Sequence, residues 1–240
     1  MEAITVKDLR ISYRSISPFS IKRSLLCKKE KKDKVFEAVK GVSFSVEDGE
    51  ILGIVGKNGS GKSTLLRSIA NIFTPDSGII DLHGNSISLL SIGVGFNGNL
   101  TGRKNIELSG LLLGFSEQKI REKMDEIIAF AELGDFIDKP VRMYSSGMHS
   151  KLAFSITACL ETDIMLIDEV LSVGDEKFKK KSYGKMKDLI SQDNKTVVIV
   201  SHSLSTLEDL CDRTLWLHEG VIREIGESHG VLAHYREFMN

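Results

Sequence analysis

The chain has 240 residues, of which 41% are hydrophobic, and its formal net charge is −1 at pH 7. Such a chain can bury the core of a full domain, and its near-zero charge argues against general nucleic-acid binding. The longest apolar runs, such as residues 164–167, fall far short of the roughly 20 residues of a membrane span, and the polar start MEAITVKDLR is no secretory signal, so we expect a cytoplasmic protein.

Two strands are expected at residues 4–13 and 35–46, separated by a basic segment. In residues 14–34, eight Lys or Arg residues meet only two acidic ones. An apolar side that could bring this segment to anionic lipid head groups would consist of Phe19, Ile21, Leu25 and Leu26. A solvated loop that keeps the protein soluble explains the same composition equally well.

The segment EILGIVGKNGSGKSTLLRSIA runs from an apolar strand, residues 51–55, through a glycine-rich loop into a helix. In this setting the pattern predicts a nucleotide-phosphate loop, because its glycines let consecutive backbone amides turn toward phosphates. Lys62 would reach the β and γ phosphates, and the Ser63 hydroxyl would ligate Mg²⁺. The residues predicted to bind ATP or GTP are Gly56, Lys57, Asn58, Gly59, Ser60, Gly61, Lys62, Ser63 and Thr64.

Residues 99–160 carry helical periodicity, and most of their apolar side chains are expected to be core: Ile106, Leu111, Leu112, Leu113, Ile120, Met124, Ile127, Ile128 and Phe130. The preceding GVGFNG, residues 93–98, lacks the lysine of a second phosphate loop. We expect a flexible joint there, with Gly93, Val94 and Phe96 where the helices meet a membrane partner.

A second candidate anion site precedes the last of these helices. In YSSGM, residues 144–148, two serines and a glycine stand before a helical pattern that has His149 and Lys151 but no acid in its first turn. An acid would normally complement the positive end of the helix dipole, so we expect this end to be reserved for an outside charge. We expect Ser145, Ser146 and Gly147 to meet the γ phosphate bound by a second copy, across an isologous twofold interface.

Two further strands deliver polar residues at their ends. The apolar run in DIMLIDEV ends at Asp168 and Glu169, and TVVIVSH ends at His202. Buried parallel strands would bring these residues to the carboxyl edge of one sheet, where ligands bind in doubly wound folds. Asp168 would hold Mg²⁺ through its water shell, Glu169 would act as the base, and His202 would contact phosphate or the attacking water. Two acids that cap a helix are the simpler alternative.

These motifs occur in the order found in ATP-binding cassette (ABC) ATPases, with Asp175 seven residues past Asp168, and the chain resembles that family over essentially its whole length. Within it, the chain looks most like the ATPase subunits of wall teichoic acid exporters, with O-antigen and capsule exporters close behind. The segments that carry this narrower resemblance are NLTGRKNIEL, PVRMYSSGMHSKLAFSI, LIDEVLSVGDEKFKKK, SHSLSTLEDLCDRTLWLHEG and the closing HYREFM.

The resemblance implies an α/β fold of the P-loop NTPase type: a core with a mostly parallel sheet, an antiparallel β region and an inserted α-helical subdomain. Residues 1–90 and 161–240 would form the core of this single domain, and residues 91–160 the helical signature subdomain. Tyr13 matches the aromatic position that stacks on adenine, although a strand-end core tyrosine also fits the pattern. Asp175 matches the loop acid that touches the opposite subunit.

Two departures from the general family pattern stand out. The signature Leu-Ser-Gly-Gly-Gln reads Tyr-Ser-Ser-Gly-Met here, which keeps the amides that would face phosphate. The glutamine that normally couples Mg²⁺ and water to the membrane subunit is absent, and its position falls near Ser91. Polysaccharide exporters resemble this sequence in that respect.

The resemblance implies an ATPase that uses ATP and Mg²⁺ in a head-to-tail homodimer at the cytoplasmic face of the cell membrane. With an integral membrane permease it would move a lipid-linked cell-surface polysaccharide, and no nucleic acid would be involved. A soluble ABC ATPase is the main alternative, but it would usually carry a coiled-coil insertion or two cassettes. A GTPase would need an aspartate after Asn194-Lys195, and a purely regulatory protein would not need Glu169.

Overall fold

The computed structural model describes residues 1–14, 35–90, 95–168, 175–190 and 195–239. Its central element is a six-stranded sheet in the order β5-β6-β7-β3-β8-β9. The strands are β5 (Ile87–Leu89), β6 (Ile164–Asp168), β7 (Thr196–Val200), β3 (Ile51–Val55), β8 (Arg213–His218) and β9 (Val221–Glu227). All neighbours are parallel except β9, which runs antiparallel to β8. The predicted apolar strands at residues 51–55 and 164–167 and in TVVIVSH are confirmed.

A second, three-stranded sheet has the order β2-β1-β4 and is antiparallel throughout. It consists of β1 (Glu2–Arg14), β2 (Val35–Glu47) and β4 (Ser77–Asp81). The two strands predicted near the N-terminus are therefore confirmed, each slightly longer than expected. Positions 15–34 of the basic segment between them are not among the described residues.

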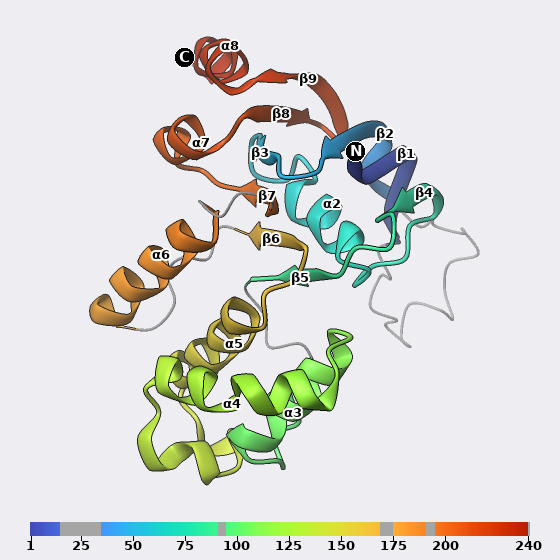
Figure 1. Ribbon diagram of the computed structural model, residues 1–240. Coiled ribbons are helices and arrows are strands. Elements are labelled where there is room, and N and C mark those ends of the chain that lie inside the picture. The colour runs from blue at the N-terminus through green and yellow to red at the C-terminus, as the bar shows by residue number, and fades with distance from the viewer. Residues whose placement is uncertain (15–34, 91–94, 169–174, 191–194, 240) are drawn as a thin grey trace, which may run out of the picture.

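Helices cover both faces of the large sheet (Figure 1). The helix α2 (Lys62–Ile69) and the small sheet lie on one face, while α6 (Glu176–Ile190), α7 (Leu204–Leu210) and α8 (Ser228–Met239) lie on the other. Two apolar clusters correspond to these two faces. Every residue of β6 and β7 is buried, which explains why both strands read as apolar runs without polar alternation.

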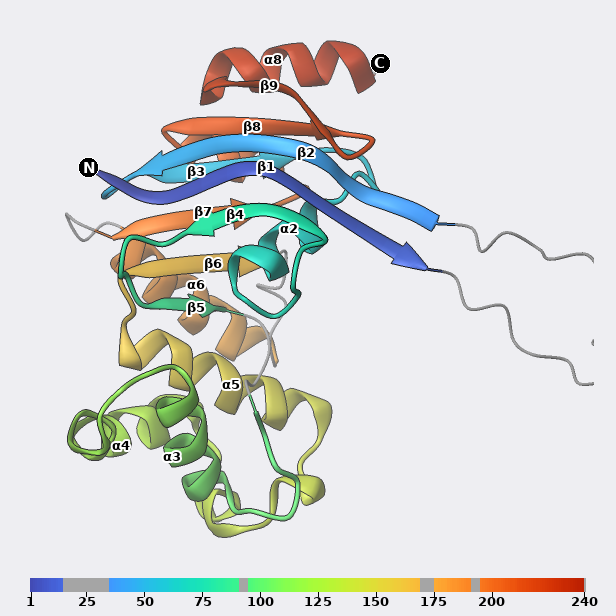
Figure 2. The same cartoon turned by 90° about the vertical axis from the view of Figure 1, so that its right-hand side faces the viewer.

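Three helices gather at the opposite end from α8 (Figure 2). They are α3 (Gly102–Leu112), α4 (Glu117–Ala131) and α5 (Ser146–Leu160), and two short 3₁₀ turns at Gly134–Asp138 and Val141–Met143 lie between α4 and α5. Their shared core contains Ile106, Ile120, Met124 and Ile127, as expected. Leu111 and Leu112 were expected in this core but are 49% and 57% exposed. The buried face of α3 follows Ile106, Ser109 and Gly110, so helical spacing turns these two leucines outward.

No helix in the described part of the chain combines the length and the apolarity needed to cross a bilayer.

Candidate functional site

The sheet brings three predicted motifs to one edge. β6, β7 and β3 are adjacent parallel strands, with Asp168 beside Val200 and Val200 beside Ile54 in the register. Asp168 ends β6, the phosphate loop follows β3, and His202 follows β7 by two residues. The phosphate loop, which precedes Asp168 by more than 100 residues, therefore lies with Asp168 and His202 at neighbouring strand ends, where doubly wound sheets bind ligands.

Close backbone packing explains the glycines of the phosphate loop. A Cβ atom at Gly56 would collide with the Leu217 carbonyl oxygen, and one at Gly61 with the Ala38 carbonyl oxygen. Gly61 also has a φ of 104°, which disfavours any side chain. It caps α2 without a side chain, and the first turn of α2 holds no acid. The N-terminus of α2 can thus receive an anion.

Lys62 and Ser63 begin α2 and lie beside Asp168. Lys62 is only 7% exposed, and its Nζ donates hydrogen bonds to the carbonyl oxygens of Gly56 at 2.7 Å and Lys57 at 3.2 Å. Burial lowers the pKa of Lys62, while the Asp168 carboxylate acts against that shift. The Ser63 hydroxyl donates to Asp168 Oδ1 at 3.2 Å, so the two predicted Mg²⁺ ligands are in direct contact.

The polar groups of this edge suit a phosphate ester with Mg²⁺. Ser60 Oγ is buried and has no protein hydrogen-bond partner. Among the described residues no three His, Cys, Asp or Glu side chains cluster as a self-sufficient metal site. Mg²⁺ typically takes one or two protein oxygens and completes its shell with waters and substrate phosphates. Ser63 and Asp168 fit that requirement.

We expect His202 to titrate below the pKa of a free histidine. Burial lowers its pKa most, followed by the positive charge of Lys62. The ring is therefore neutral at neutral pH and gains its proton only at lower pH than usual. Because the unfolded chain binds this proton more readily, the stability linked to His202 is present above the unfolded pKa and is lost as pH falls through the folded pKa.

An NMR titration of the His202 ring signals, assigned with His202→Gln, measures this pKa. Lys62→Met should raise it, since one of the two causes is removed. A wild-type pKa at or above that of free histidine would contradict the expected arrangement of charge.

Several predicted positions lie outside the described residues: Glu169, Ser91, Gly93 and Val94. Glu169 follows the last described residue of β6, Asp168, so its role as base stays a prediction from the sequence. Phe96 is described, and its ring packs against that of His149 with centroids 4.7 Å apart. The burial that accompanies this contact lowers the pKa of His149, so His149 adds little positive charge near neutral pH.

Tyr13 lies near the end of β1, close to α2. Its hydroxyl is 3.1 Å from Thr64 Oγ1, and the edge of its ring contacts Phe73 with centroids 6.2 Å apart. The residue is 41% exposed, which does not fit the alternative of a core tyrosine. An exposed ring beside the phosphate loop is what stacking on a base requires.

The turn formed by Ser145, Ser146 and Gly147 begins α5. Ser145 is the N-cap, and its hydroxyl accepts a hydrogen bond from the Met148 amide at 3.2 Å. The first turn of α5 contains no acid, and both serines are exposed. The helix start expected near Met148 thus lies two residues earlier, because the Ser145 side chain caps the helix.

Asp175 has both carboxylate oxygens engaged within the chain. Oδ1 accepts from the Phe178 amide at 2.9 Å at the start of α6, and Oδ2 is 2.6 Å from Lys151 Nζ. The hydrogen bond from Lys151, then that from the Phe178 amide, lowers the pKa of Asp175. The sequence pointed to Lys151 only as a basic residue near the start of α5, and nothing in its spacing indicated a bond to a residue 24 positions away.

The amino-acid sequence of the chain is similar to a known protein family and to individual proteins of that family. Residues 39–172 match the family described as ABC transporter. The O-antigen export system ATP-binding protein RfbB of Myxococcus xanthus is 44% identical over 246 residues, which cover 99% of this chain and 56% of that protein. The teichoic acids export ATP-binding protein TagH of Bacillus anthracis is 48% identical over 202 residues, which cover 84% of this chain and 36% of that protein. The chain therefore spans about half or less of the length of these relatives.

A solved structure of a dimeric ATP-binding cassette in a post-hydrolysis state, bound to ADP and phosphate, superposes with a TM-score of 0.70 at 22% sequence identity. The alignment covers 94% of this chain and 98% of that chain. This likeness concerns the fold, and it confirms the predicted α/β architecture of parallel core sheet, antiparallel β region and helical insertion.

Proposed function

Because the chain belongs to the ABC transporter family, we propose that it is the ATP-hydrolysing subunit of an exporter for a lipid-linked cell-surface polysaccharide, with wall teichoic acid as the first candidate. The observation that carries this proposal is the meeting of Lys62, Ser63 and Asp168 at one sheet edge, with Ser63 Oγ 3.2 Å from Asp168 Oδ1. These are the groups that hold the phosphates and Mg²⁺ in P-loop NTPases.

Each group of the loop has a distinct part in this function. The backbone amides from Gly56 to Thr64 cradle the phosphates, and Lys62 exchanges its bonds to the Gly56 and Lys57 carbonyls for phosphate oxygens. Ser63 and Asp168 would hold Mg²⁺, which would supply the positive charge that neutralises the leaving phosphates. Glu169 accepts a proton from the attacking water, neutral His202 contacts the γ phosphate, and Tyr13 stacks on the adenine ring.

A second copy of the chain completes the site. Ser145, Ser146 and Gly147 of one copy offer a helix N-terminus without acids to the γ phosphate held by the other. Asp175 lies at the contact between copies. In this arrangement residues 1–90 and 161–240 are the nucleotide-binding core, and residues 91–160 are the helical signature subdomain. ATP favours the closed homodimer because closure adds contacts to the nucleotide.

Export of a polysaccharide also requires a partner in the membrane. An integral membrane permease receives the closure movement, which places this chain at the cytoplasmic face of the cell membrane. Export of O-antigen is the second candidate, favoured by a relative that aligns with 99% of the chain. The aligned teichoic acid relative covers 84% of it, although at the higher identity of 48%.

Steady-state ATP hydrolysis at increasing protein concentration tests the enzymatic part of the proposal. We expect the rate per chain to rise with concentration until dimers form, because a lone copy lacks half of its site. Full turnover by a dilute monomer would refute the shared site, and no hydrolysis at any concentration, with or without the permease, would refute the enzyme.

Depletion of the protein in its native cell tests the cargo. Accumulation of lipid-linked teichoic acid inside the cell supports the first candidate, and accumulation of lipid-linked O-antigen supports the second. Normal display of both polymers after depletion would refute polysaccharide export.

A further inference from the structure

The side chain of Lys57 connects the phosphate loop to the C-terminal helix. Its Nζ lies 4.7 Å from the centroid of the Phe238 ring in α8, within the range of a cation–π contact. The backbone of the same residue is part of the loop: the Lys57 carbonyl oxygen accepts from Lys62 Nζ at 3.2 Å and from the Ser60 amide at 3.1 Å. One residue thus belongs to the nucleotide site through its main chain and to α8 through its side chain.

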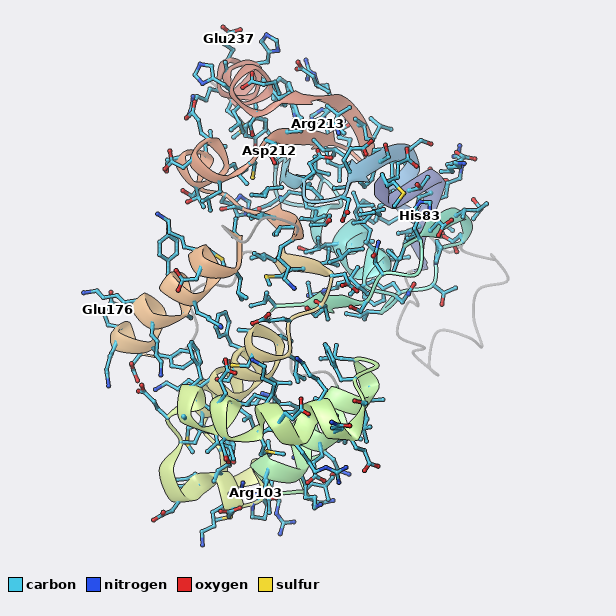
Figure 3. All side chains as sticks on the ribbon, viewed as in Figure 1. His83, Arg103, Glu176, Asp212, Arg213 and Glu237 are labelled. Atoms are coloured by element: carbon cyan, nitrogen blue, oxygen red, sulfur yellow. The ribbon has the colours of Figure 1, made fainter. Side chains whose placement is uncertain are left out.

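Phe238 in turn belongs to a cluster of aromatic rings that includes Trp216. The Trp216 and Phe238 rings have centroids 5.1 Å apart, and the Arg223 guanidinium carbon lies 4.4 Å from each ring. Tyr235, one helical turn before Phe238, packs against Trp216 at 5.3 Å. Trp216 is 3% exposed, so its surroundings consist almost entirely of protein. Figure 3 labels Glu237, the neighbour of Phe238, on α8 at the far end from the helical insertion.

The hairpin of β8 and β9 supports the loop from the same side. The Gly220 amide donates to the Ser60 carbonyl at 3.1 Å, and Gly56 packs so closely on the Leu217 carbonyl that no side chain fits. These contacts fix the loop backbone against the end of β8. The Lys57 side chain is itself exposed, and Phe238 is the described aromatic ring with which it makes a cation–π contact.

We propose that Phe238 is a positioning residue for the phosphate loop, which it holds through Lys57, and that nucleotide binding is transmitted along this contact to Trp216 and α8. The inference depends on the proposed function, because it requires nucleotide in the loop. When nucleotide binds, its negatively charged phosphates attract the Lys57 ammonium group, which is in contact with the Phe238 ring. Coupling between sites is reciprocal. If nucleotide changes the affinity of α8 for a partner by some factor, that partner changes the affinity of the loop for nucleotide by the same factor.

Tryptophan fluorescence offers a direct test, because Trp216 is the single tryptophan of the chain. MgADP and MgATP are titrated separately against the whole protein, and binding is measured independently by calorimetry. We expect nucleotide to change the Trp216 emission in the wild type. Phe238→Leu and Lys57→Met should each reduce this change and weaken nucleotide binding about two- to fivefold, as expected for loss of one exposed cation–π contact.

Conservative variants separate positioning from simple packing. Phe238→Tyr keeps an aromatic ring and Lys57→Arg keeps a cation. Both variants should therefore show the wild-type change in Trp216 emission and the wild-type nucleotide affinity. Tyr235→Phe alters the neighbourhood of Trp216 on the same helix without touching Lys57, and it should keep the response. The combination of Lys57→Met with Phe238→Leu should weaken binding no more than either single change, because both remove the same contact.

The outcomes distinguish this inference from the proposed function. Wild-type affinity and wild-type emission change in Lys57→Met, an exposed substitution that should not disturb folding, would overturn the inference and leave ATP binding intact. Additive losses in the double variant would overturn it as well. Failure of the wild-type protein to bind nucleotide in calorimetry would instead overturn the proposed function and, with it, the coupling.

Discussion

Glu169→Gln is expected to lower the rate of ATP hydrolysis at least about 100-fold, within the range lost when a general base is removed. The amide of glutamine has nearly the shape of the carboxylate but cannot accept a proton from the attacking water. ATP affinity should remain, because Lys62, Ser63 and Asp168 are unchanged. Since hydrolysis no longer opens the dimer, the variant should accumulate as an ATP-dependent dimer in size-exclusion chromatography.

Glu176→Gln provides the matched control. This substitution also replaces a carboxylate by an amide, seven positions further along the chain. Glu176 lies at the exposed start of α6 (Figure 3). We expect it to keep wild-type turnover and to form no persistent dimer. If Glu169→Gln retained turnover, or stayed monomeric in ATP while binding it, the assignment of Glu169 as base in a shared site would be wrong.

The parts of the fold that could be predicted are those determined by residues close to one another in the sequence. The apolar runs of β6 and β7 have no polar alternation because both faces of these strands are buried, so their limits could be read within a residue. The glycines of the phosphate loop have a local cause as well, in backbone approaches that exclude side chains at Gly56 and Gly61. Motif order then sufficed to predict the α/β architecture.

Contacts between distant segments could not be predicted in this way. The pairing of Lys151 with Asp175 joins α5 to the start of α6, and the contact of Lys57 with Phe238 joins the phosphate loop to the C-terminal helix α8. Each depends on how helices pack on the sheet, which no local pattern records. The same reason explains the exposed leucines of α3: helical spacing was clear, but the face turned toward α4 and α5 is set by Ile106, Ser109 and Gly110.

The bond between Lys151 and Asp175 also links the two halves of the proposed mechanism within one chain. α5 begins at the turn that we propose meets the second copy, and Asp175 follows β6, whose last residue, Asp168, we propose serves the chain's own nucleotide. In the proposed mechanism, this ion pair would couple a movement at the start of α5 to Asp175 at the start of α6. The side chain of Lys151 is 14% exposed and that of Asp175 is 61% exposed, so solvent and salt reach this pair from the side of the acid.

Ser145→Arg should abolish ATP hydrolysis, with a loss of at least about 100-fold, and leave the ATP affinity of the monomer nearly unchanged. The bulky side chain would fill the space at the start of α5 that a phosphate on the second copy must enter. In the proposed dimer Ser145 faces the nucleotide of the second copy, so the substitution should leave the loop around Lys62 in its own chain unchanged. Hydrolysis and single-chain binding, measured on the same preparation below the concentration of dimerisation, separate the two effects.

Ser116→Arg is the control that isolates the role of this turn from helix capping. Ser116 caps α4 with the same geometry: its hydroxyl accepts from the Lys119 amide at 3.2 Å, as that of Ser145 does from Met148. Loss of either cap costs about 1 kcal/mol of stability, so both variants should be destabilised alike. Only the change at Ser145 should stop turnover, because α4 carries Glu117 in its first turn and offers no site to an anion. Equal loss of turnover in both variants would assign the effect to folding, and a large loss of monomer affinity in Ser145→Arg would place this turn in the chain's own nucleotide site.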